Sequence, residues 1–422
     1  MSAVFQHHRT VHTLSYNVFD PARCAFPPPR VPLLPMLTRS AVARSPSGDF
    51  ALVATGRARR SYTRGRYALY DAYRLSGVGS RGSLLAPAYH CRTMLDPAIN
   101  LNAPLLLYGL DAQLAPDFAS LERLVRSAEQ PVRAMLLTHY FGFAQQVAPI
   151  KAFCDAHGIA LIEDCSHALF DLRGAERLGE HGRYTIASPY KLFPCEEGGL
   201  LIPGLGVALP TEPNRAPGVR AELKGLASAI ESSWKHYRDL HRGADLARLD
   251  DDIRRIAAEP IERGAQTRAE LTGTSPMYLD REQGLAGSAV SGWLMKLCDI
   301  GHVAARRRAN YARWNDAVRG LPHCRPLFAE LPANCVPYMF PLLIEHPQPH
   351  FYVLKKLGMP IWRWDEMAVS DCATAQHYRQ HVLHVPCHQA LSERELDWMT
   401  SAVAKVMRQV PVPLAAHAAA ST

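Results

Sequence analysis

The chain is poor in lysine. Its 422 residues include eight lysines, so most of its 47 basic residues are arginines. Only Lys151 and Lys191 precede residue 224. Because lysine is normally among the commonest residues of a globular chain, such an isolated lysine is hard to attribute to general surface charge. Lys191 is therefore the first candidate for a chemical role.

Three further absences narrow the class of protein. The ten cysteines contain no Cys-x-x-Cys pair and no regular spacing, which argues against a disulfide framework, and we expect no metal ligands. No apolar run approaches the roughly 18 residues of a membrane-spanning helix. The N-terminus also lacks the apolar core of a signal peptide. We therefore expect a cytoplasmic protein with reduced thiols.

The formal net charge is +8, but the basic residues are scattered. Short runs occur at Arg57–Arg60 and Arg306–Arg308, without the interleaved aromatic residues of a nucleic-acid-binding stripe. The charge fits a small anionic substrate equally well. We expect small-molecule partners, no nucleic acid and no membrane span.

Short apolar runs alternate with amphipathic segments between residues 62 and 202. This alternation predicts an α/β fold with a mostly parallel sheet covered on both faces. The length suggests two domains. The expected strands are 84–89, 105–108, 133–138 and 159–164, and the expected helices are 67–75, 117–126 and 147–157.

The remaining composition sets the domain boundaries. Closely spaced prolines predict an extended N-terminal arm over residues 1–45. We expect the large α/β domain over 46–245 and linking helices with a smaller α+β domain over 246–410. In that second part we expect helices at 220–272, 284–321, 351–357 and 392–407, and a strand at 338–344. Residues 411–422 are expected to form a flexible tail.

An acid at a strand end is followed by a lysine on a turn between strands. Asp164 ends the strand that starts at residue 159, and Lys191 precedes a glycine pair and another apolar run. Ligands of open α/β sheets sit beyond the carboxyl ends of the strands. Pyridoxal 5'-phosphate needs an acid that keeps its pyridine nitrogen protonated and a lysine that forms the Schiff base. The competing interpretation of Asp164 is a helix N-cap.

Other residues could complete such a site. His167 could hydrogen-bond the cofactor's phenolic oxygen, although a lone histidine is often structural. Gly65 and Arg66 open a predicted helix, whose free N–H groups could bind phosphate, and Ser188 has a hydroxyl close to Lys191. An aromatic ring from Tyr89 or His90 could stack on the pyridine.

In five ordered segments the chain resembles the DegT/DnrJ/StrS aminotransferases, which are fold-type I pyridoxal phosphate enzymes that aminate keto sugars. The segments are THYFG (138–142), IEDCSHA (162–168), KLFPCEEGG (191–199), RRRANY (306–311) and LHVPCHQALSEREL (383–396). The resemblance implies Lys191 as the Schiff-base lysine and Asp164 as the pyridinium partner. It also implies His167 beside the phenolic oxygen, phosphate binding at Gly65 and Arg66, and a homodimer with shared active sites.

The chain departs from the family pattern at three places. Arg64-Gly65-Arg66 stands where Ser-Gly-Thr is usual, and Cys91 is nearest to the position of the stacking aromatic ring, so Tyr89 or His90 must replace that ring. Ile186 stands where a serine is expected, and Ser188 is its substitute. The segment 210–285 matches poorly, so residues contributed by a partner subunit are not assigned.

The leading functional hypothesis is a transaminase that moves an amino group from an amino acid, taken as glutamate, to a keto acceptor. By resemblance, the acceptor is a nucleotide-linked keto sugar in polysaccharide or secondary-metabolite biosynthesis. Two alternatives stay open: a pyridoxal phosphate enzyme acting on a non-sugar amine or amino acid, and a catalytically silent scaffold with the same fold.

Overall fold

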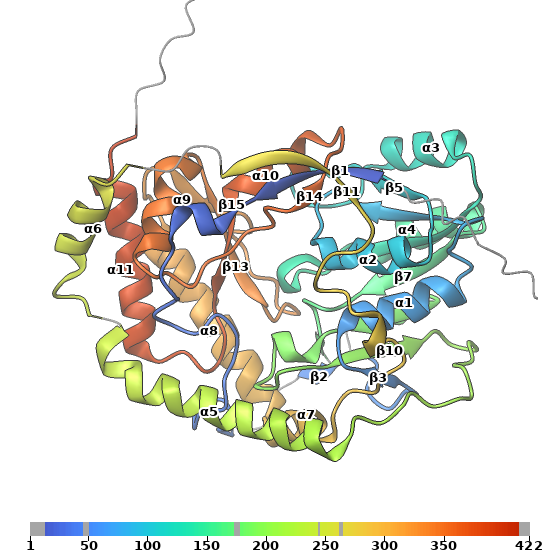
Figure 1. Ribbon diagram of the computed structural model, residues 1–422, viewed down its shortest axis with the longest axis horizontal. Helices are drawn as coiled ribbons and strands as arrows, with labels where there is room; N and C mark the ends of the chain where they lie inside the picture. The colour runs from blue at the N-terminus through green and yellow to red at the C-terminus, as the bar shows by residue number, and fades with distance from the viewer. Residues whose placement is uncertain (1–12, 45–49, 173–177, 244, 261–264, 413–422) are drawn as a thin grey trace, which may run out of the picture.

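Seven strands between residues 60 and 203 form the main sheet, in the order β3-β10-β9-β7-β6-β4-β5 (Figure 1). The computed structural model describes residues 13–44, 50–172, 178–243, 245–260 and 265–412. The sheet strands are β3 (Arg60–Tyr62), β4 (Ser83–Pro87), β5 (Leu105–Tyr108), β6 (Val132–Thr138), β7 (Ala160–Asp164), β9 (Tyr184–Ala187) and β10 (Gly199–Pro203). Five strands pair in parallel. At one edge β10 pairs antiparallel with both β9 and β3, so β10 alone is reversed and β3 runs in the same direction as the other five.

The two faces of the sheet are buried under different helices. Leu84 and Ala86 of β4 belong to the apolar cluster that includes Tyr67 and Met94 of the helices on one face. Leu85, between them, belongs to the second cluster. The covering helices are α1 (Gly65–Leu75), α2 (Arg92–Asn100), α3 (Phe118–Ser127) and α4 (Val147–Ala156). Successive residues of β4 thus pack against opposite layers, which confirms the predicted mostly parallel sheet that is covered on both faces.

The C-terminal half forms a smaller α+β unit. Its three-stranded antiparallel sheet has the order β12-β13-β15. The strands are β12 (Cys324–Pro326), β13 (Met339–Ile344) and β15 (Val382–Pro386), and the helices are α8 (Ile300–Val318), α9 (Pro347–Lys356), α10 (Ala373–His381) and α11 (Glu393–Gln409). Two of the five family-like segments, 306–311 and 383–396, meet here.

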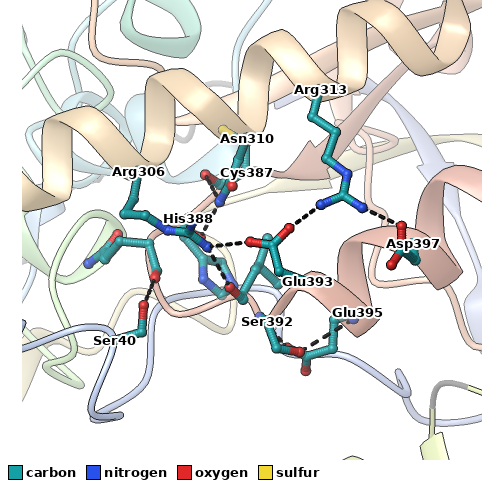
Figure 2. Close-up of polar contacts among 12 residues, drawn as sticks. Ser40, Arg306, Asn310, Arg313, Cys387, His388, Ser392, Glu393, Glu395 and Asp397 are labelled. Atoms are coloured by element: carbon teal, nitrogen blue, oxygen red, sulfur yellow. Dashed lines mark hydrogen bonds and ion pairs between the residues drawn. The ribbon is translucent and has the colours of Figure 1, made fainter.

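Polar contacts join α8 to the start of α11 (Figure 2). Arg306 and Arg313 both pair with Glu393. Ser392 caps α11 in a capping box with Glu395, because each side chain accepts a hydrogen bond from the other's backbone N–H. The predicted helix 392–407 is thereby confirmed, with its start fixed by the cap.

The described part of the predicted N-terminal arm begins with a β-strand. Strand β1 (Thr13–Phe19) lies between β11 (Gln266–Thr272) and β14 (Met367–Ala368), antiparallel to both. A short 3₁₀ turn at Pro21–Cys24 follows, and the proline-rich part then packs on the C-terminal half, where Arg30 N donates to the Gly358 oxygen over 2.9 Å. Residues 1–12 and, in the predicted tail, 413–422 lie outside the described residues.

The stretch between the two sheets is less helical than its composition predicts. It contains α5 (Val219–Gly243), α6 (Leu249–Ala257) and α7 (Ala289–Leu297), but residues 266–272 are the strand β11. The helix prediction was wrong for this strand because its pairing with β1 overrides local propensity. Strands β2 (Phe50–Leu52) and β8 (Phe170–Leu172) form a separate pair. In the part of the chain described, each helix is too short or too polar to cross a bilayer.

Candidate active site

Three neighbouring strands end at the same edge of the main sheet. Thr138 at the end of β6 is in register with Asp164 at the end of β7, and Asp164 is in register with Ile186 of β9. Lys191 ends the 3₁₀ turn Pro189–Lys191 that follows β9. This edge, where the carboxyl ends of parallel strands meet, is where α/β folds place ligands.

A narrow pocket of about 40 Å³ lies at this edge. Six of the eight predicted site residues border it: Gly65, Arg66, Asp164, His167, Ser188 and Lys191. Residues without a predicted cofactor contact border it too, among them Cys91, Thr138, Tyr190 and Trp364. Trp364 comes from the segment after α9, so the pocket combines both halves of the chain.

Asp164 presents a buried carboxylate that lacks a basic partner among the described residues. Its side chain is 5% exposed, and Oδ1 accepts a hydrogen bond from Ser166 N over 2.9 Å. That N–H lies two residues on, in a turn rather than in the first turn of a helix, so the N-cap interpretation does not hold. Thr138, the neighbour in register, has a buried hydroxyl without a partner in the described structure. Both groups are available to a polar ligand.

His167 is held as a neutral ring. Phe141 N donates to its Nδ1 over 3.3 Å, so the ring proton lies on Nε2. Burial lowers the pKa of His167 well below its usual range, and the nearby Lys191 and His384 lower it further. The ring stacks on Tyr338 with the centroids 4.4 Å apart. His167 can therefore offer an N–H but not a positive charge.

Lys191 lies over the same tyrosine ring. Its Nζ is 5.6 Å from the ring centroid of Tyr338. Its main-chain oxygen accepts a hydrogen bond from Arg307 of α8 over 3.4 Å. The turn that carries Lys191 is thus anchored to the C-terminal half, and Lys191 is one of the residues that border the pocket.

The start of α1 has the features of an anion site. The N-cap residue, Arg64, makes no side-chain capping hydrogen bond, so the first amides of the helix lack a side-chain cap. A Cβ on Gly65 would lie 2.2 Å from Ser188 Oγ, so only glycine leaves room for that hydroxyl. Ser188 Oγ is in turn 2.9 Å from Ser166 Oγ. The side chain of Arg66, in contrast, donates to the main-chain oxygen of Met277.

The structure places neither Tyr89 nor His90 in the pocket. The Tyr89 hydroxyl is 3.1 Å from His384 Nε2, and its ring packs on Trp364 with the centroids 4.7 Å apart. His90 lies between the Cys91 oxygen and the amide of Ala368. Cys91, one position further on, borders the pocket instead. Tyr89 and His90, which follow β4, therefore lie outside the pocket lining. The apolar run 84–89 in the sequence does not predict this change of direction.

Known proteins resemble this chain in both sequence and fold. Residues 60–203 match the sequence model of the DegT/DnrJ/EryC1/StrS aminotransferase family, which confirms the resemblance for this part of the chain. The L-glutamine:scyllo-inosose aminotransferase of Streptomyces griseus is 29% identical over 168 residues, 38% of this chain and 39% of that protein. The GDP-perosamine synthase of Vibrio cholerae is 22% identical over 140 residues, 33% of this chain and 38% of that protein.

Solved structures agree over a longer stretch. PseC of Helicobacter pylori, an aminotransferase of pseudaminic acid biosynthesis, covers 83% of this chain and 86% of its own, with a TM-score of 0.57 and 14% identity. A 3-amino-5-hydroxybenzoic acid synthase gives a TM-score of 0.55 at 16% identity, again over 83% of this chain and 86% of its own. These likenesses confirm the predicted fold class, the fold-type I transferases. The sequence matches span under two fifths of the two curated relatives' own length.

Proposed function

We propose that the chain is a pyridoxal phosphate-dependent aminotransferase. The observation that carries this proposal is the buried, cation-free carboxylate of Asp164 in one pocket with the amine of Lys191. A buried carboxylate without a counter-charge is costly, and a protonated pyridine nitrogen would supply that charge. The family match over residues 60–203 supports the same cofactor.

The residues present fit this cofactor. Asp164 would hold the pyridine nitrogen, and the neutral ring of His167 would donate from Nε2 to the phenolic oxygen. The uncapped amides of Gly65 and Arg66, with the Ser188 hydroxyl, would hold the phosphate. The cofactor supplies an electron sink when bound, which allows an amino acid to lose its α-proton.

The chain's own residues then divide the work. Among the described residues that border the pocket Lys191 is the one lysine, so its amine would take up and return the proton as general base. Asp164 would hold the pyridine nitrogen of the cofactor in its protonated form. The Tyr338 ring fixes the plane of His167, because the two rings stack. Arg307 holds the Lys191 main chain in place.

For the substrates we propose an amino acid donor and a keto acceptor of the sugar or cyclitol type. Glutamate is the donor by family resemblance, and the L-glutamine named for the S. griseus relative is the second donor to test. The acceptor class follows the names of two relatives, a perosamine synthase and an inosose aminotransferase. The position that is aminated is left to an acceptor screen.

The test compares Lys191→Ala with Lys151→Ala. Lys151 is partly exposed on α4 and pairs with Asp155, so it controls for the loss of a lysine. We expect the wild type and Lys151→Ala to show visible cofactor absorbance that shifts toward the near ultraviolet with glutamate or glutamine. Lys191→Ala should bind the cofactor without the covalent band and lose turnover. Normal turnover in Lys191→Ala would disprove the assignment.

Two other outcomes separate the alternatives. A band that ignores every amino donor, with activity on another amine, would favour the non-sugar enzyme. No cofactor binding at all would favour the silent scaffold. We also propose a cytoplasmic setting, which the ten free cysteines support because thiols persist in a reducing compartment.

We propose that the chain works as a homodimer and that α5 lies in the interface. Four apolar side chains of α5 are exposed: Val219 (75%), Leu223 (63%), Ile230 (53%) and Trp234 (59%). Their spacing places them on one side of the helix, and α7 runs beside it with Trp293 52% exposed (Figure 1). An apolar stripe of this kind usually marks an interaction surface.

Light scattering after size exclusion tests this interface. Leu223→Glu combined with Trp234→Glu should convert a dimer into monomers, whereas Lys224→Glu, an exposed change on the same helix, should not. If both variants stay dimeric, the interface lies elsewhere. A wild-type monomer would contradict the dimer itself.

A further inference from the structure

Two histidines and a glutamate meet at the end of the small sheet, away from the pocket around Lys191. His323 lies in the turn between α8 and β12, and Glu345 and His346 join β13 to α9. His323 Nδ1 is 3.0 Å from Glu345 Oε2, and His346 Nε2 is 3.9 Å from the same oxygen. One potential ligand atom from each residue lies within 4.8 Å of the others.

A third histidine faces this cluster from the protein interior. His350, in α9, is buried; its ring lies beside the main chain of Val410, but neither ring nitrogen makes a well-formed hydrogen bond in the described structure. Its ring centroid is 5.6 Å from that of His323 and 6.0 Å from that of His346. A buried imidazole needs polar partners for both nitrogens, and the Val410 contact can serve only one of them, so the other is available to a ligand.

The ring spacing fits metal coordination. Tetrahedral zinc with Zn–N distances of about 2.1 Å places the centroids of two imidazole ligands roughly 5 Å apart. The three centroid distances here are 5.0, 5.6 and 6.0 Å. We propose that His323, Glu345, His346 and His350 bind one divalent transition-metal ion, and the three-nitrogen, one-carboxylate set favours Zn²⁺.

The backbone already holds the four residues near one another. Glu345 N donates to the His323 oxygen over 2.9 Å, and His350 N donates to the His346 oxygen over 3.3 Å. His323, Glu345 and His346 already lie within reach of one ion, whereas the His350 ring, which is outside that group, would have to turn toward it. The ion would tie the turn before β12 to the start of α9. His323 is 22 residues from Glu345, too far for the short spacing that identifies zinc motifs in a sequence.

A titration of the full chain with Zn²⁺, and with Co²⁺ as a spectroscopic probe, tests this site. We expect one equivalent to bind tightly, with a visible Co²⁺ band typical of tetrahedral nitrogen and oxygen ligands. The same equivalent should raise the melting temperature by mass action. His323→Ala combined with His346→Ala should weaken binding by roughly 100-fold or more, since two of four ligands are lost.

His157→Ala is the matched control. His157 also lies beside a glutamate, Glu122, at 3.7 Å, but that pair forms no group of three potential ligands with any other described residue. The His157→Ala variant should bind the metal with the affinity of the wild type. Equal affinity in all three proteins would overturn the proposal, and so would the absence of binding to the wild type. Strong sulfur-to-cobalt absorbance would also overturn it, because it would assign the ion to cysteines. Aminotransferase activity does not enter this measurement.

Discussion

The guanidinium group of Arg307 hydrogen-bonds the main-chain oxygen of Lys191, with Nη2 3.4 Å from that oxygen. Arg307 is fully buried, and burial lowers its pKa to about 10, which still leaves it charged at neutral pH. The same guanidinium also donates to the side-chain oxygen of Gln389 and to the main-chain oxygens of Leu192, Pro337 and Tyr338. One side chain of α8 thus fixes the turn of the candidate catalytic lysine and the segment that carries Tyr338.

Replacing this arginine should damage both stability and the pocket. Arg307→Met leaves several buried oxygens without donors, so we expect a loss of about 3–5 kcal/mol in the free energy of unfolding. Cofactor retention should fall as well, because the Lys191 turn loses its anchor. Denaturant unfolding and cofactor absorbance measure the two effects.

Arg306→Met is the control for this variant. Arg306 is the preceding residue on α8 and pairs with the exposed Glu393 (Figure 2). Because that ion pair is half-exposed, its loss should cost at most about 1 kcal/mol. Equal effects of the two variants would show that the Arg307 contacts to the lysine turn do not matter.

A second prediction concerns the contact between Gly65 and Ser188. Gly65→Ala would place a methyl group 2.2 Å from Ser188 Oγ, and the next contact, Ser188 Cβ, is 3.6 Å away. We expect Gly65→Ala to destabilise the fold by about 1–3 kcal/mol and to weaken cofactor binding. Adding Ser188→Ala should recover part of the stability, because it removes the clashing oxygen. Additive losses in this double-mutant cycle would rule out the clash.

The parts of the site that follow strand ends could be predicted from the sequence. Asp164 is the last residue of one strand and Lys191 lies on the short turn after another, and the geometry of parallel sheets brings such ends together. The glycine at the start of α1 was predictable for a similar reason, since helix starts bind anions. These predictions need only local periodicity and chain order.

Other parts depend on contacts between distant segments. Trp364 borders the pocket from the C-terminal half, and Tyr338 stacks on His167 from the same half. Strand β1 pairs with β11, as in the contact of Ser15 with Glu270, 255 residues apart. No local pattern encodes such pairings. The choice among residues 89–91 failed for a related reason, because the chain leaves the strand at Pro87 and its direction afterwards is set by packing.

A third prediction uses the pH dependence of Glu163, the residue before Asp164. Its carboxylate is fully buried and accepts hydrogen bonds from the amides of Gly179, His181 and Gly182 and from His139. Burial alone would raise the pKa of Glu163, but the hydrogen bonds from His139 and the two glycine amides outweigh it, so the pKa is lowered.

The sign of the effect follows from this lowered pKa. The carboxylate stabilises the fold fully above the pKa of an unfolded glutamate, about 4.3, and this contribution is lost as the pH falls through the lowered value. Glu163→Gln should therefore lower the free energy of unfolding by about 2–4 kcal/mol at pH 7. In acid the wild type should lose this advantage, so that the two proteins become similarly stable. Urea unfolding across the pH range measures the difference between them. A gap between the two proteins that stays constant into acid would contradict the assignment.

The last prediction concerns Trp364, whose side chain borders the pocket. At about 40 Å³ the pocket is smaller than the few hundred Å³ typical of ligand sites. The indole of Trp364 packs on Tyr89, with the ring centroids 4.7 Å apart, and its centroid lies 6.0 Å from that of His167. Binding of a phosphorylated pyridine should therefore require this indole to move.

Trp364→Phe should relieve that requirement. A phenyl ring keeps an aromatic contact with Tyr89 but takes up less volume, so less binding energy is spent on displacing it. We expect pyridoxal phosphate to bind several-fold more tightly to Trp364→Phe than to the wild type in a fluorescence titration. Trp362→Phe is the control, because Trp362 precedes it by two residues and does not border the pocket. Equal or weaker affinity in Trp364→Phe would mean that the indole contributes to the bound state rather than obstructing it.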